Sequence, residues 1–295
     1  MRQDTQSRTF LFTGLINRPG LILILCLLPL LQSCSTSYAY SNLDWLVHWF
    51  VDDYVELTEE QKQDFDLYFS QLQQWHREEE LDRYLTSLKA IRHSLTEEKL
   101  SGDALAAEVT RRSKESYQYW LDLIATADQP LGKLAVTLSA QQKDEFFLAL
   151  DKKLAELDDK AARNDKPTKR RKRLLQAVDP WFGQLNRNQQ KQLKQWSLEI
   201  APTRLLLREY REVWSAGLKE ALYAPEEEIS ARLSRVLTAH REWQSEAYQS
   251  TITENRRLTE RLISDLLESR THAQNRQLLK ELNLWINRIE RLKKA

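Results

Sequence analysis

Apolar side chains recur every three or four residues along most of the chain after residue 42. One such stripe follows Thr58 and comprises Phe65, Tyr68, Phe69, Leu72, Trp75, Leu81, Tyr84, Leu85, Leu88 and Ile91. This spacing places the apolar side chains on one face of an α-helix. The pattern therefore predicts long amphipathic helices, each of which buries one face.

The same spacing, combined with capping residues and prolines, predicts helices along the rest of the chain. The expected helices are 43–54, 58–91, about 96–130, 139–162, a short basic helix ending at 178, 186–200, 202–222, one of about 40 residues beginning at 225, and 271–294. Residues 179–183 are expected to form a turn. No stretch alternates apolar and polar residues as a strand does, and no Asn-Gly or Asp-Gly hairpin signal occurs. The expected fold class is all-α, an elongated bundle of long amphipathic helices without a sheet.

Four of the expected helix starts share a short motif. Residues 57–61, 138–142 and 185–189 each contain Leu, a capping residue, two variable residues and Gln, and residues 271–274 repeat all but the leucine. The capping side chain accepts a hydrogen bond from the amide three residues on, and the Gln at that position returns one. The motif thus predicts capping boxes, in which Glu would serve as well as Gln.

Residues 1–34 have a different pattern. Three arginines precede an apolar core, Leu21 to Leu31, which ends in Leu31-Gln32-Ser33-Cys34. A positive segment, a short apolar segment and a small residue before a cleavage point indicate a secretory signal. The end of this signal resembles the lipobox of bacterial lipoproteins, which implies cleavage before Cys34 and acylation of that cysteine. Eleven apolar residues are also too few for a bilayer span of about 20.

The signal sets the expected domain organisation and location. We expect a signal peptide at 1–33, a lipidated tether at 34–42 and a helical domain at 43–295, with a possible sub-boundary near 164–168. Residue 35 is Ser rather than the Asp that retains enterobacterial lipoproteins in the inner membrane. The expected location is therefore the outer membrane, with the protein on its periplasmic face.

Composition narrows the range of partners and excludes disulfide bonds. Removing residues 1–33 leaves 41 basic and 42 acidic residues, a net charge of −1. This charge gives no electrostatic attraction to nucleic acid. Cys26 is lost with the signal and Cys34 carries lipid, which leaves no cysteine pair. Stability must therefore come from packing.

Two resemblances accompany these motifs. Cys34-Ser35, Tyr40-Ser41-Asn42-Leu43-Asp44-Trp45-Leu46 and the residues up to Thr58 resemble the mature N-terminus of an uncharacterised family of Gram-negative lipoproteins. That family usually has Tyr-Asn-Asn where this chain has Tyr-Ser-Asn, and the resemblance implies a location without a mechanism. The capping motif is similar to the Leu-Thr-x-x-Gln motif of Spy-like periplasmic chaperones, which are helical cradles for unfolded clients. This match covers five residues per occurrence.

Candidate chemistry is sparse. Asp44, His48 and Asp52 stand four residues apart on one expected helix, a spacing that fits either a metal or proton site or a solvated face. We expect the other polar candidates to be surface residues: His76, Glu79, Glu80, Arg83, His240 and His272. The chain has no Gly-rich phosphate loop, no Gly-x-Ser-x-Gly and no His-Glu-x-x-His. No catalytic, metal or cofactor residue is predicted.

Two surfaces remain as candidates for binding. Six basic residues lie within 166–173, where lipid, phosphate or an acidic partner would explain them as well as plain solvation. Among the tryptophans, Trp45, Trp49 and Trp181 lie near segment ends, where they could serve as partner anchors. The sequence therefore favours a non-enzymatic helical binding or scaffolding module of the cell envelope with a periplasmic protein partner. A Spy-like chaperone and a peptidoglycan hydrolase are the alternatives.

Overall fold

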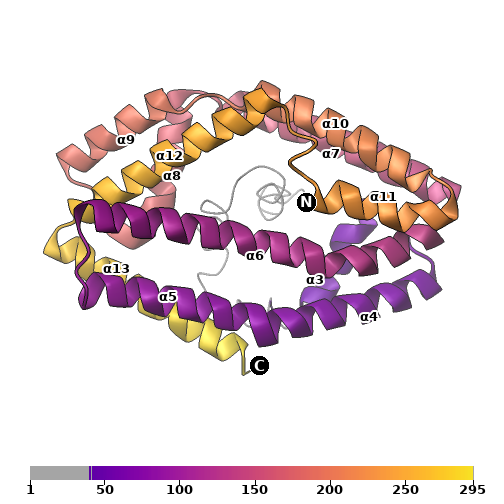
Figure 1. Cartoon of the computed structure of the whole chain (residues 1–295), viewed down its shortest axis with the longest axis horizontal. Coiled ribbons are helices and arrows are strands. Elements are labelled where there is room, and N and C mark those ends of the chain that lie inside the picture. Colours follow the sequence, from indigo (N-terminus) through magenta and orange to yellow (C-terminus); the bar gives the residue numbers. More distant parts are fainter. Residues whose placement is uncertain (1–39, 41, 295) are drawn as a thin grey trace, which may run out of the picture.

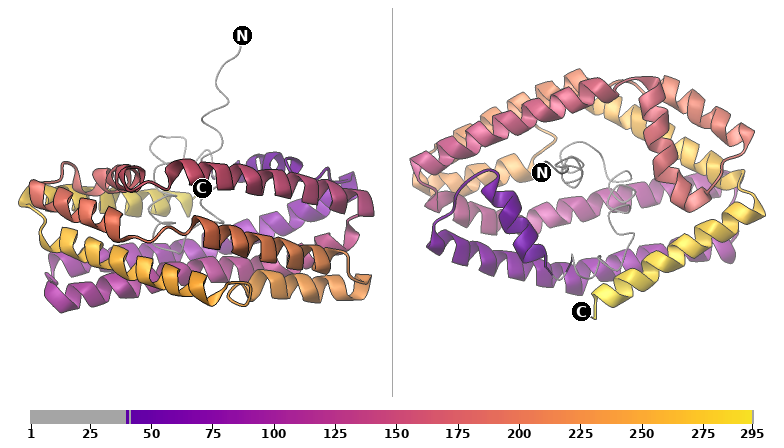
Figure 2. Two further views of the ribbon diagram at one scale, coloured as in Figure 1. Left: turned by 90° about the horizontal axis from the view of Figure 1, so that it is seen from above. Right: turned by 180° about the vertical axis from the view of Figure 1, so that it is seen from behind.

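The computed structural model describes residue 40 and residues 42–294, and among them helices alternate with short connections and no strand occurs. The helices are α3 (Leu43–Asp52), α4 (Glu59–Trp75), the π-helix η3 (His76–Glu80), α5 (Leu81–Thr96), α6 (Gly102–Thr137), α7 (Ala140–Asn164), α8 (Pro167–Phe182), α9 (Arg187–Glu199), α10 (Arg204–Leu222), α11 (Glu226–Thr238), α12 (Glu246–Glu268) and α13 (His272–Leu292). Their ribbons follow an oval outline (Figure 1) that is flattened when seen from above (Figure 2). The predicted all-α class is confirmed.

Two helices continue past prolines at which they were expected to end. The helix expected to end at Pro130 begins only at Gly102 and continues through Pro130 to Thr137. Gly132 and Ala135 lie buried beyond the proline, where α6 packs along α11. Likewise α8 passes Pro180 and ends at Phe182, before Gly183 with its positive φ of 60°, so the expected turn at 179–183 was wrong. In both helices, tertiary packing outweighs the loss of one backbone hydrogen bond.

The expected helix of about 40 residues from 225 was also wrong, because residues 239–245 separate α11 from α12. The Ser245 hydroxyl accepts a hydrogen bond from the Tyr248 amide and caps a new helix start. The helix expected from Thr58 is continuous in direction but passes through the π-helix η3. Such wide turns are rare in helices and often occur at functional sites.

The apolar core is divided into separate clusters around the oval. One joins α6, α7, α10 and α11 around Phe147, Leu222 and Ile229. A second joins α8, α9 and α12 around Leu193 and Leu266. Smaller clusters join α5 to α13. Each helix therefore buries only a stripe, as the three-and-four spacing requires.

The chain order of contacts shows two matched halves. In the first half, α4, η3 and α5 lead to α6 and then α7, and in the second half α9 and α10 lead to α11, α12 and then α13. The last helix of each half packs on an early helix of the other half: α7 packs on α10, and α13 packs on α5. Between them α6 runs along α11 and α12. The break between α7 and α8 lies at residues 165–166.

Candidate functional site

The capping motifs of the first half meet each other at one end of the oval. Gln61 and Gln142 form a reciprocal amide pair, in which Gln61 Nε2 donates to Gln142 Oε1 at 3.2 Å and Gln142 Nε2 donates to Gln61 Oε1 at 2.7 Å. Each amide also donates to a main-chain carbonyl outside its own helix, that of Thr137 at 2.9 Å and that of Glu56 at 2.8 Å. The pair therefore joins two helix starts to the segments that precede them.

The second half repeats this arrangement. Gln189 Nε2 donates to Gln274 Oε1 at 3.0 Å, and Gln274 Nε2 donates to Gln189 Oε1 at 2.8 Å. The carbonyls bound are those of Ser269 and Gln184, at 3.3 and 3.1 Å. All four carbonyls belong to residues two positions before a cap. Thr137 precedes Ser139 and Glu56 precedes Thr58, while in the second half Ser269 precedes Thr271 and Gln184 precedes Asn186.

These pairs confirm the capping boxes and correct one part of the prediction. Thr58, Ser139, Asn186 and Thr271 all cap as expected. However, Gln61 is 5% exposed, Gln189 is fully buried, and both amides use their NH2 groups as donors. Glu has no such donor when ionised, so it is not equivalent to Gln at these positions.

The π-helix carries an acidic side chain into the interior. Glu80 is 1% exposed and forms an ion pair with Arg83, which also binds Asp122 of α6 at 2.6 Å. Burial raises the pKa of the Glu80 carboxyl, and the Arg83 guanidinium opposes that shift. The Arg83 guanidinium lies 4.8 Å from the centroid of the Tyr119 ring. The expectation of surface positions for Glu80 and Arg83 was therefore wrong for Glu80, because η3 turns it inward.

His76 is also enclosed rather than exposed. Its Nδ1 lies 3.0 Å from the Tyr40 hydroxyl, and its ring meets the Tyr84 ring edge-on at 5.7 Å. Burial lowers the pKa of His76 to about 4. The imidazole is thus neutral near pH 7 and acts as a hydrogen-bonding core residue. In contrast, His272 is exposed.

The second half has a corresponding aromatic contact with a buried arginine. Tyr210 of α10 stacks on Tyr248 of α12 with ring centroids 5.5 Å apart, as Tyr84 of α5 meets Tyr119 of α6 at 4.9 Å. Arg211 is 3% exposed, and burial lowers the pKa of its guanidinium. Its Nε and Nη2 have no hydrogen-bond partner among the described residues. The spacing of apolar residues does not predict the burial of Arg211.

The Asp44, His48 and Asp52 stripe is not assembled as a ligand set. His48 Nε2 binds Asp66 of α4 instead, and both acidic residues of the stripe are exposed. Within the described part of the chain, no group of three His, Cys, Asp or Glu side chains could hold a metal ion. The stripe therefore has the geometry of a solvated face with one cross-helix contact.

The basic run occupies the start of α8. Pro167 is its first residue, and Lys166, Lys169 and Lys172 are exposed. Arg170 instead donates from Nη1 to the Ile200 carbonyl at 2.5 Å, at the C-terminal end of α9. A cation at a helix C-terminus is favourable, so part of the run has a structural role.

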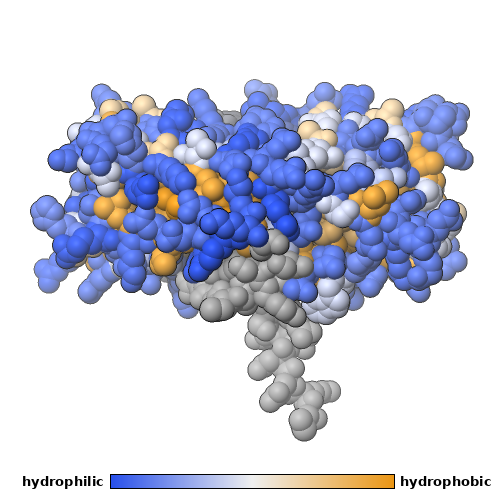
Figure 3. Space-filling model, turned by 90° about the horizontal axis from the view of Figure 1, so that it is seen from below, coloured by the Kyte–Doolittle hydropathy of each residue, from blue (hydrophilic) through white to orange (hydrophobic). Residues whose placement is uncertain are grey.

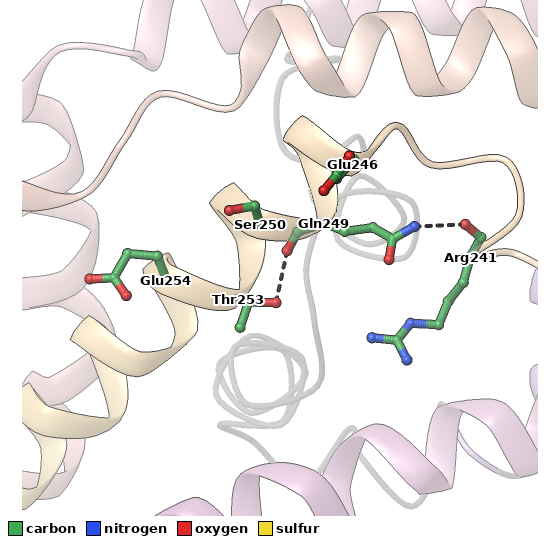
Figure 4. A pocket seen from close by; sticks show the side chains of 6 residues that line it. All are labelled: Arg241, Glu246, Gln249, Ser250, Thr253 and Glu254. Carbon is green, nitrogen blue, oxygen red and sulfur yellow. Dashed lines mark hydrogen bonds between the residues drawn. The ribbon is translucent and has the colours of Figure 1, made fainter.

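Two shallow hollows occur on the described surface. One, of about 330 Å³, lies along the first turns of α12 and is lined by Arg241, Glu246, Gln249, Ser250, Thr253 and Glu254 (Figure 4). The other, of about 410 Å³, lies between α6 and α11 where Ser234 donates to Asp128 at 2.6 Å. Most lining residues of both hollows are polar or charged, with Gly132 and Ala231 as the exceptions in the second.

Exposed apolar side chains are mostly scattered, and Figure 3 shows them as separate strips on a largely hydrophilic face. On α3, however, Trp45 is 67% exposed and Trp49 is 43% exposed. Trp75, Trp120 and Trp181 are partly buried and Trp285 is buried. The expectation of exposed tryptophans is confirmed for α3.

The predicted signal peptide and Cys34 lie outside the described residues, so their prediction stands on the sequence. No helix in the described part of the chain is long and apolar enough to span a membrane.

The fold and these surfaces define an all-helical protein with two matched halves and a paired Gln contact in each. The chain belongs to DUF6279, a family of unknown function, whose model matches residues 53–249. Neither a curated protein nor a solved structure matches the chain. The family match begins at residue 53, after the lipobox-like segment that ends at Cys34.

Proposed function

We propose that this protein is an outer-membrane lipoprotein, acylated at Cys34, whose helical domain works in the periplasm as a binding or scaffolding module. The observation that carries the proposal is the lipobox-like end of the signal, Leu31-Gln32-Ser33-Cys34, directly before a helical domain. Acyl chains contribute about 0.8 kcal/mol per buried methylene, so several on one residue give a durable anchor. The partner is a periplasmic protein.

The geometry of the described residues favours binding over catalysis. The two hollows described above are open to solvent and lined mostly by polar or charged residues. The buried titratable groups sit in structural contacts such as Glu80 with Arg83 and His76 with Tyr40. The exposed His48 and Asp66 pair lies on the surface of α3 and α4, away from either hollow. An acid–base site is usually a concave pocket with convergent perturbed groups.

The capping motif gives little support to the chaperone alternative. Its Gln side chains are buried in pairs, so they offer no surface to an unfolded client. Purified protein should therefore fail to suppress aggregation of an unfolded substrate. Clear suppression at near-stoichiometric ratio would make the chaperone the better proposal.

The anchor is tested by replacing Cys34→Ala in the full chain in a Gram-negative host. An unacylated precursor should accumulate and leave the detergent phase in phase partitioning. Cys26→Ala is the matched control, because it removes a cysteine of the signal core without touching the acylation point, and its product should remain acylated. A mature, membrane-bound Cys34→Ala product would refute the anchor.

The binding role is tested with photo-crosslinking residues placed at exposed positions of the wild-type chain. Ser250 in the α12 hollow and Ala231 in the α6–α11 hollow are suitable sites. We expect one of them to give an adduct with a periplasmic protein, identified by mass spectrometry. Absence of protein adducts at both Ser250 and Ala231 would contradict a scaffolding role.

A further inference from the structure

Helix α3 is apolar and yet uncovered. Seven of its ten residues are apolar, and none of the ten is buried. Trp45 and Trp49, one turn apart, both face outward beside the exposed Asp44 and Asp52. Indole side chains bury more area than most residues when they are covered, so leaving two exposed forgoes stabilisation.

The second half of the fold shows that these tryptophans are not needed to build this corner. Counting back from the caps Thr58 and Asn186, the partly buried Leu46 and Phe50 of α3 correspond to Leu174 and Val178 of α8. Both of these α8 residues pack in an apolar cluster, which matches the inward face.

The outward positions differ between the two helices. By the same count, Trp45 and Trp49 correspond to Arg173 and Ala177, neither of which is aromatic. The exposed indoles are therefore specific to α3 and to what α3 meets.

The position of α3 in the chain indicates what that surface meets. The helix begins nine residues after Cys34. A connection of nine residues spans at most about 30 Å when fully extended. If Cys34 is embedded through its acyl chains, the start of α3 therefore lies within about 30 Å of the bilayer surface.

We infer that the Trp45 and Trp49 face of α3 lies on the headgroup region of the membrane and acts as a second contact beside the lipid. Tryptophan favours this region because its ring is apolar and its N–H is polar. Helix α3 contains no Lys or Arg, so the contact is with zwitterionic lipid and does not depend on attraction to anionic headgroups. This inference rests on the proposed acylation of Cys34.

The test uses the acylated full-length product reconstituted in vesicles of phosphatidylcholine brominated near the headgroup, a collisional quencher of indole fluorescence. Wild-type fluorescence should be quenched, and Trp45→Phe/Trp49→Phe should remove most of the quenchable fraction. Trp285→Phe is the matched control, because Trp285 is buried in the core, and it should leave the fluorescence intensity that is lost to quenching unchanged. Raising salt from 0.1 to 1 M should alter the quenching less than twofold, since screening acts on exposed charges.

The two levels of the proposal fail in different ways. Mass spectrometry of the Cys34 peptide reports acylation, and quenching reports α3. An acylated chain whose quenching is the same with and without Trp45 and Trp49 would overturn the α3 contact while keeping the anchor. A chain that lacks acyl groups but still binds vesicles with those two indoles quenched would overturn the anchor and keep the contact.

Discussion

Replacing Gln61→Glu changes the chemistry of the first amide pair without changing its shape. The Gln61 Oε1 atom accepts from the Thr58 amide and from Gln142, and a carboxylate can keep both contacts. The Gln61 Nε2 atom donates to the Thr137 carbonyl, to the Thr137 hydroxyl and to Gln142 Oε1. An ionised carboxylate loses all three donations and places its charge against the Thr137 carbonyl and Gln142 Oε1.

The expected cost follows from burial. Leaving a buried acceptor without a donor costs about 1–3 kcal/mol. Gln61 is 5% exposed, and in the variant the Thr137 carbonyl loses this donor while Gln142 Oε1 keeps only the Ser139 amide and faces a charge. The free energy of unfolding should therefore fall by roughly 1–3 kcal/mol at pH 7. If Gln61 served only in the capping box, Gln61→Glu would leave the stability unchanged, because Glu also completes a capping box.

The pH dependence gives an independent check with a definite sign. Burial without a cationic partner raises the pKa of the introduced carboxyl above its unfolded value of about 4.3. The folded variant then binds more protons than the unfolded chain, so its stability relative to wild type falls as pH rises above that value. Urea denaturation of both proteins at pH 4.5 and 7 should show the larger deficit at pH 7.

Gln71→Glu is the matched control, because Gln71 lies exposed on the same helix. It makes the same charge change and should shift stability by less than about 0.5 kcal/mol. If Gln61→Glu differs from wild type by no more than the control at pH 7, the amide pair is not a stabilising contact.

Two further predictions concern other buried contacts. Gly217→Ala should lower the free energy of unfolding by about 1–3 kcal/mol, because a Cβ there would lie 2.6 Å from the Trp243 ring; Gly132→Ala should cost less, and a stabilised Gly217→Ala in thermal unfolding would contradict the packing. The lowered pKa of His76, about 4, means that the unfolded chain binds more protons below about pH 6.5. As the pH is lowered from 6.5 to 4, the free energy of unfolding should therefore fall by up to about 1.4 kcal/mol per pH unit. In urea titrations His76→Gln should reduce this dependence on pH. An equal dependence in wild type and variant would show that His76 is not the titrating group.

Helix class and four of the helix starts could be predicted because their causes are local. A cap and its glutamine lie within four residues, and an amphipathic stripe needs only its own spacing. The sequence alone thus predicts Thr58, Ser139, Asn186 and Thr271 as caps, and the structure confirms all four. The same local signals misplaced the ends at Pro130 and Pro180, since a proline removes one hydrogen bond that packing can outweigh.

The candidate site depended on contacts that have no local signature. Gln61 meets Gln142 across 81 positions of sequence, and Gln189 meets Gln274 across 85. Glu80 is buried because it lies in a π-helix, and the polar sequence of that helix predicts an exposed segment. Likewise, the exposure of Trp45 depends on which helices cover α3, and periodicity does not specify that.

The sequence by itself determined most of the helices, four of their caps and the lipobox-like pattern at Cys34, because each depends on neighbours within a few residues. Only the tertiary structure decided the break at 239–245, the oval arrangement of two matched halves and the burial of the paired glutamines. These features depend on which stripes face one another, and an amphipathic stripe specifies that a face is buried without specifying its partner.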